Sequence, residues 1–176
     1  MTAAQRRSAI YDQLTAAQTP ISATALARQF SVTRQVVVGD IALLRAEGHS
    51  ITATPRGYMI PAETGLRRTI ACHHSGEDTQ KELFAMVDCG CTVVDVIVEH
   101  PVYGQLSGQL QVFSRYDADV FWDALQKNGA QPLCSLTGDI HLHTLVCPDE
   151  ARKARVLAAL EEKGYLTAYE NEVNGK

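Results

Sequence analysis

Two histidines, His141 and His143, stand two positions apart in a run of β-branched and apolar residues at 140–146. Side chains of a β-strand point alternately to opposite faces, so both imidazoles would emerge on one face about 7 Å apart. Two such imidazoles could bind one metal ion. His74 and Glu82 could complete the site, because Zn²⁺, Ni²⁺ and Fe²⁺ accept imidazole nitrogen and carboxylate oxygen. The spacing leaves one alternative open, a pair of solvated histidines on an exposed edge strand.

The charge of the chain is divided unevenly. The 176 residues carry a net charge of −4 and are 45% hydrophobic, which is ordinary for a globular protein. Residues 1–60 hold six arginines against three acidic residues, a net charge of +3, whereas residues 61–176 have a net charge of −7. A basic first third joined to an acidic remainder indicates that one part meets phosphate and that the other has a different role.

The apolar periodicity of the basic part predicts three helices, at residues 2–18, 22–30 and 34–47. Ser22 and Thr33 are the expected N-caps of the second and third helices. Residues 50–60 then indicate two short strands around a Pro-Arg-Gly turn. This order of elements is that of a winged helix-turn-helix, in which the later helix enters the major groove of DNA.

The candidate DNA-binding residues follow from that arrangement. Arg34 and Gln35, in the first turn of the third helix, are the residues able to hydrogen-bond guanine and adenine edges. Thr33 precedes them, and Val38 is expected on the same outward face. Arg56 at the hairpin tip would reach phosphate or the minor groove. The alternative is a three-helix bundle with a charged surface that binds no DNA.

Residues 67–176 alternate between strand and helix patterns. We expect strands at residues 69–73, 92–99, 105–114 and 140–147, and helices at 77–87, 117–127 and 150–163. The order βαββαβα describes a ferredoxin-like sandwich with an extra helix. The chain is therefore predicted to be an α+β protein, with a DNA-binding domain at 1–60 and a metal- and effector-binding domain at 67–176.

The cysteines and the hydropathy of the chain indicate the cellular compartment of the protein. Five cysteines, an odd number, occur without a secretory signal, so they are expected to be reduced and mostly buried. Cys89 and Cys91, one residue apart, have neither a thioredoxin-like nor a zinc-knuckle spacing. No apolar run approaches the roughly 18 residues of a membrane span. We therefore expect a cytoplasmic protein that does not contact a membrane.

Longer motifs carry a resemblance to a known family. SVTRQVVVGDI at 31–41 and ATPRGY at 53–58 resemble the N-terminal half of the niacin-responsive transcriptional repressors of NAD biosynthesis and niacin uptake (NiaR type). VDVIVEHPVYG at 94–104 and HLHT at 141–144, followed by PDE at 148–150, are similar to that family's three-histidine (3H) effector domain. The resemblance covers nearly the whole chain. It implies a homodimeric repressor that binds double-stranded operator DNA with nicotinic acid as co-repressor and a divalent metal in the C-terminal domain.

The same resemblance implies the metal ligands. The family's ligands correspond here to His74, Glu82, His141 and His143. The neighbouring His73 leaves the first assignment uncertain by one residue, and His74 is favoured because the family shows a spacing of eight residues before the glutamate. Three histidines and one glutamate suit Zn, Ni, Fe or Mn, so the sequence does not identify the metal.

His100 and Tyr103, in the turn between two predicted strands, are the candidate effector-contacting residues. Two other functions stay open. A metal-dependent hydrolase-like enzyme is one, because three protein ligands and a water at zinc also describe a hydrolytic site. A DNA-binding dimer with a purely structural metal is the other. The sequence offers no convincing nucleophile or general base, so a repressor without enzymatic activity is predicted.

Overall fold

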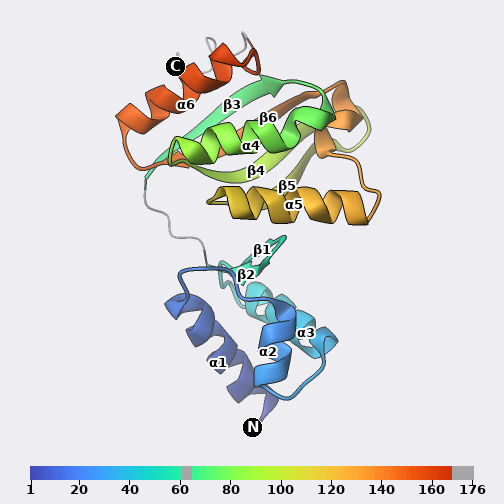
Figure 1. Ribbon diagram of the computed structural model, residues 1–176. Helices are drawn as coiled ribbons and strands as arrows, with labels where there is room; N and C mark the ends of the chain where they lie inside the picture. Colours follow the sequence, from blue (N-terminus) through green and yellow to red (C-terminus); the bar gives the residue numbers. More distant parts are fainter. Residues whose placement is uncertain (61–64, 168–176) are drawn as a thin grey trace. The chain divides into compact units, whose positions relative to one another are not determined.

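The computed structural model describes residues 1–60 and 65–167. The chain falls into two compact units that divide after residue 63, and each is described here by itself (Figure 1). Among the described residues, no helix combines the length and the apolar character that crossing a membrane requires.

The N-terminal unit contains three helices and a hairpin: α1 (Ala3–Ala16), α2 (Ala23–Gln29), α3 (Arg34–Ala46), β1 (Thr52–Thr54) and β2 (Gly57–Met59). Both expected N-caps are present. The Ser22 side chain accepts a hydrogen bond from the Ala25 N–H at 3.1 Å, and the Thr33 side chain accepts one from the Val36 N–H at 3.3 Å. These caps satisfy backbone N–H groups that have no partner inside the helix, so they set where α2 and α3 begin.

A partly buried ion pair links α1 to α3. Asp40, 4% exposed, accepts hydrogen bonds from Arg6 through Nε at 2.6 Å and through Nη2 at 3.2 Å. The hydrophobic core around it consists of Ile10, Leu14, Ala23, Leu26, Ala27, Val37, Ile41, Leu44 and Ile51. Arg6 therefore contributes to holding α3 in place, and its charge is already matched within the fold.

The hairpin is anchored by a residue that the sequence pattern did not single out. Ile21 forms a bridge to Tyr58 of β2, with N–H to carbonyl distances of 2.8 and 2.9 Å. Gly57 next to it has φ of 143°, and a Cβ there would overlap the Ile21 carbonyl oxygen. Residue 57 must therefore be glycine for the hairpin to lie against the start of α2.

Residues 65–167 of the C-terminal unit form four strands and three α-helices: β3 (Leu66–His73), α4 (Thr79–Asp88), β4 (Thr92–His100), β5 (Gly104–Val112), α5 (Arg115–Lys127), β6 (Ile140–Cys147) and α6 (Glu150–Glu162). Short 3₁₀ turns, η1 (Gly76–Asp78) and η2 (Leu133–Thr137), precede α4 and β6. The strands form one antiparallel sheet in the order β3-β6-β4-β5.

This strand order corrects the expected ferredoxin-like topology. In a ferredoxin-like sheet the last strand lies at an edge, whereas here β6 lies between β3 and β4. The chain order of the elements was predicted correctly, but alternation along a sequence does not specify which strands become neighbours. The central place of β6 matters for the site, because both edges of the strand are paired and His141 and His143 lie on its buried face.

The core of this unit lies between the sheet and its helices. Leu83 and Met86 of α4, Ala118 of α5, and Val156 and Leu160 of α6 pack together with buried strand residues in one cluster. Figure 1 shows α4 and α5 lying across the same face of the sheet. The buried side chains of α4 point toward this face of the sheet.

Two of the five cysteines depart from the expected reduced state. Cys91 and Cys147 form a disulfide, since β4 and β6 pair from Thr92 opposite Val146 and bring the two residues within 4.4 Å at Cα. No local spacing signals this pair, because the two residues are 56 positions apart. The other three, Cys72, Cys89 and Cys134, are buried and outside any disulfide, as predicted.

Candidate metal centre and DNA-reading face

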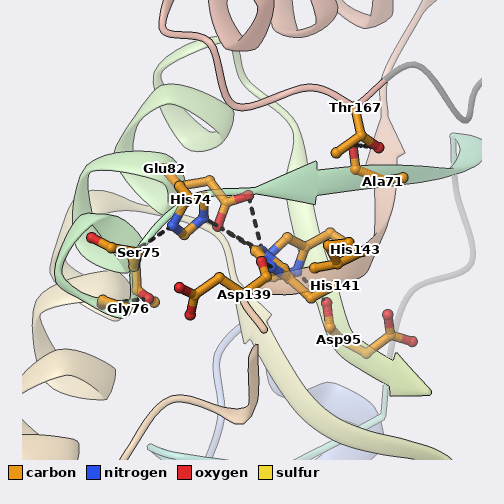
Figure 2. Close-up of polar contacts among 12 residues, drawn as sticks. Ala71, His74, Ser75, Gly76, Glu82, Asp95, Asp139, His141, His143 and Thr167 are labelled. Atoms are coloured by element: carbon orange, nitrogen blue, oxygen red, sulfur yellow. Dashed lines mark hydrogen bonds and ion pairs between the residues drawn. The ribbon is translucent and has the colours of Figure 1, made fainter. Parts of the chain in front are cut away.

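Four of the expected site residues meet at one buried point (Figure 2). His141 and His143 lie on β6, Glu82 on α4, and His74 directly after β3. The Nε2 atoms lie 2.7 Å (His74), 3.3 Å (His141) and 3.2 Å (His143) from Glu82 Oε2. Glu82 is 0% exposed and the two β6 histidines are each 2% exposed. The alternative of solvated histidines on an exposed edge strand is therefore wrong.

Backbone carbonyls fix the orientation of all three rings. Each Nδ1 contacts one carbonyl oxygen: His74 that of Ser75 at 2.8 Å, His141 that of Asp139 at 3.0 Å, and His143 that of Asp95 at 2.6 Å. A carbonyl only accepts hydrogen bonds, so Nδ1 must carry the proton in each ring. In the neutral imidazole, Nε2 then presents a lone pair.

Three such lone pairs directed at one carboxylate repel it unless a cation lies among them. The contact at His74 shows the problem most clearly, because its buried Nε2 lies 2.7 Å from a Glu82 oxygen yet forms no aligned hydrogen bond. A ring with Nδ1 held by a carbonyl and Nε2 directed inward is the usual arrangement of a metal-binding histidine. Either protons or a metal ion must supply the positive charge.

The pKa values follow from the same contacts. Burial disfavours the charge of Glu82, but the three imidazoles outweigh it and hold the pKa of this carboxyl well below its usual value. For His74 and His143, burial lowers the pKa and the Glu82 carboxylate outweighs that effect, so both pKa values are raised. Without a metal, therefore, the site favours the ionised form of Glu82 and the protonated forms of His74 and His143, and a divalent ion could replace those protons.

The spacing and type of the donor atoms fit a metal ion. Atoms bound to one ion at about 2.0–2.1 Å lie roughly 2.9–3.4 Å apart in octahedral or tetrahedral geometry, and the Glu82 contacts of His141 and His143 fall in that range. Cys72 adds a sulfur, since its Sγ and one ligand atom each of Glu82 and His141 all lie within 4.8 Å of one another. This buried Cys/Glu/His group could hold a metal.

The structure also distinguishes between His73 and His74 as the histidine that belongs to the site. His73 is exposed on β3, whereas His74 is buried against Glu82. His100 is the last residue of β4 and Tyr103 lies in the turn that follows; the His100 ring accepts the Tyr103 N–H at 3.2 Å and the two rings lie 4.9 Å apart. Within the described part of the chain, neither contacts the Glu82 cluster.

Sequence reasoning missed Asp95, which supports the site from β4. The pairing register shifts between Val93 and Asp95, so the strand is irregular at this point. The Asp95 carbonyl accepts from His143 Nδ1, and its carboxylate accepts the Thr144 N–H at 3.0 Å. The side chain thereby satisfies a backbone donor beside the irregularity. A lone aspartate in an apolar strand was the only available signal.

The candidate DNA-reading residues lie on α3 and in the wing. Thr33, Arg34 and Gln35 are exposed at the N-terminal end of α3. Val38, expected on the outward face, is half-buried, and so is Arg56 between β1 and β2. Because Thr33 caps α3, the first turn holds Arg34 and Gln35 side by side with both side chains in solvent.

Family models match both units of the chain. An HTH domain model matches residues 6–59 and a 3H domain model matches residues 67–169. The chain is 40% identical over 163 residues to a probable transcription repressor NiaR of Thermotoga maritima, covering 92% of this chain and 93% of that protein. It is also 40% identical over 168 residues to the transcription repressor NadR of Bacillus subtilis, covering 93% of each.

Proposed function

The chain belongs to the family of HTH and 3H domain transcription repressors of the NiaR/NadR type, and we propose that it represses genes of NAD biosynthesis and niacin uptake when nicotinic acid is bound. The relatives are transcription repressors and not enzymes, which sets aside the hydrolase-like alternative. The N-terminal unit reads the operator, and the C-terminal unit senses the co-repressor.

The observation that carries the proposal is the convergence of three Nε2 atoms on a fully buried Glu82. In this proposal His74, Glu82, His141 and His143 bind one divalent metal, and the carbonyls at Nδ1 hold the rings ready for it. The bound ion supplies a positive centre at which a small anion can coordinate.

Nicotinic acid suits such a centre because it is small and carries one carboxylate. An open coordination position would give that carboxylate a strong, local electrostatic partner. His100 and Tyr103 contact each other, and among the described residues neither contacts the cluster around Glu82. We therefore assign the primary effector contact to the metal.

The repressor acts as a homodimer in this proposal. One winged domain reads only a few base pairs, so a selective operator needs two recognition helices held at a fixed spacing. Nicotinic acid would favour the arrangement of the two copies that matches the operator. Linkage then requires that operator DNA raise the affinity for nicotinic acid by the same factor by which nicotinic acid raises the affinity for DNA.

Calorimetry of nicotinic acid into metal-loaded protein, with and without operator, tests the coupling. We expect tighter binding in the presence of operator, no such gain with scrambled DNA, and loss of binding after chelation. An effector affinity unchanged by operator would refute the coupling. Binding that survives removal of the metal would refute coordination. Metal-dependent stability without any nicotinic acid binding would support the remaining alternative, a purely structural metal.

A further inference from the structure

Cys72 lies beside the proposed metal ligands in the register of the sheet. In the pairing of β3 with β6 it stands directly opposite His141, and Ile70 stands opposite His143. Directly opposed residues of an antiparallel pair point to the same face. The Cys72 side chain therefore points to the face from which His141 reaches Glu82, and Cys72 is itself 0% exposed.

The Cys72 sulfur lies close to two atoms that would bind the ion. Two atoms bound to one ion, one at about 2.3 Å through sulfur and one at about 2.0–2.1 Å, lie at most about 4.4 Å apart. Cys72 Sγ lies within 4.8 Å of ligand atoms of both Glu82 and His141. Cys72 Sγ is therefore near enough to reach, by an adjustment of its side chain, an ion that those two residues bind.

We propose that Cys72 is a further metal ligand and that its thiolate makes this a soft-donor site. The inference rests on the proposed metal centre and deepens it, because sulfur changes the class of metal. Thiolate favours Zn, Ni, Fe or Cu, whereas Mn prefers carboxylate, carbonyl and water oxygen. Of the ions that three histidines and a glutamate would accept, Mn is therefore disfavoured in this chain.

Cobalt(II) gives the sharpest test, because thiolate bound to cobalt produces an intense near-ultraviolet charge-transfer band and imidazole and carboxylate do not. Full-length protein is loaded with one equivalent of Co²⁺ and bound cobalt is measured by ICP-MS. We expect stoichiometric cobalt and the band in the unmodified chain. Cys72→Ala should lose the band, and the matched Cys89→Ala, which removes a buried thiol from the C-terminal end of α4, should keep it.

Competition between metals gives a second readout. Loss of an outer-shell partner typically lowers metal affinity 10–100-fold, so loss of a direct ligand should lower zinc affinity by at least about tenfold. Manganese affinity should change little in Cys72→Ala, so the preference for zinc over manganese should shrink by the same factor. An unchanged preference would overturn the assignment.

The possible results distinguish an error in the role of Cys72 from an error in the proposed metal centre. Stoichiometric cobalt without a charge-transfer band would overturn the role of Cys72 and leave the His/Glu centre standing. Failure of the unmodified chain to bind cobalt, zinc or nickel would overturn both. A band that persists in Cys72→Ala would assign the sulfur to another cysteine. If that variant does not fold, a band that survives in both Cys89→Ala and Cys134→Ala identifies Cys72 by elimination.

Discussion

Gly39 lies in the middle of α3, where replacing glycine by alanine should change stability by a well-defined amount. It is exposed, and a Cβ added at this position would meet nothing within 4 Å. Glycine in a helix interior is about 1 kcal/mol less favourable than alanine, so Gly39→Ala should stabilise the N-terminal unit by that amount. For a domain of this size, 1 kcal/mol corresponds to a rise in Tm of roughly 4–8 °C. Thermal unfolding followed by circular dichroism measures it.

Binding to operator DNA should move in the opposite direction. Gly39 follows Gln35 by four positions, which places it on the same face of α3 one turn further along. A helix backbone that approaches DNA closely at this position has no room for a methyl group. If the displaced helix loses one side chain contact to a base, affinity falls by ~1–3 kcal/mol, or about 5–150-fold. Fluorescence anisotropy with labelled operator measures the loss.

A variant that weakens α3 without adding bulk is the control. Ala46→Gly, at the last residue of α3, should lower Tm slightly and leave operator affinity nearly unchanged. If Gly39→Ala fails to raise Tm, the argument from helix propensity is wrong. If it raises Tm and operator affinity stays the same, the backbone of α3 does not approach DNA at this position.

Three further predictions concern the metal centre and the N-terminal unit. The double variant His141→Ala with His143→Ala removes two of three imidazoles, so bound metal measured by ICP-MS should fall to background; stoichiometric metal would exclude the assignment. Arg34→Ala should cost ~1–3 kcal/mol on the operator and relax base preference; equal losses on operator and scrambled DNA would contradict base reading. Asp40→Ala leaves Arg6 without its partner and should lower Tm, whereas an unchanged Tm would show that the pair adds no stability.

Local chemistry explains which parts of the fold the sequence predicted. Ser22 and Thr33 were expected as caps because short polar side chains satisfy the first N–H groups of a helix, and both do so here. The strand order was not predictable in the same way. Pairing of β6 with both β3 and β4 depends on contacts between residues far apart in the chain, and no local pattern encodes them.

The same distinction applies to the site. His141 and His143 stand out because side chains two positions apart on a strand share a face. The carbonyl groups that orient the rings carry no signal in a sequence, since every residue has one. Cys72 becomes relevant only once β3 and β6 are paired, because that register places it opposite His141. Sequence thus indicated the side chains of the centre, and the fold was needed to find what orients them.

The disulfide and the proposed metal ligands join nearly the same two parts of the chain. Glu82 and His141 are 59 residues apart, and Cys91 and Cys147 are 56 residues apart. In the chain-entropy model, a disulfide that closes a loop of this length lowers the conformational entropy of the unfolded chain. This loss raises the free energy of the unfolded state by about 4 kcal/mol. The disulfide persists when the chain unfolds, whereas an ion bound by the folded site would be released, so the two act on different states of the chain. An ion held by the folded site would therefore add its stabilisation whether Cys91 and Cys147 are oxidised or reduced, and the reduced, metal-free chain is the form nearest to unfolding.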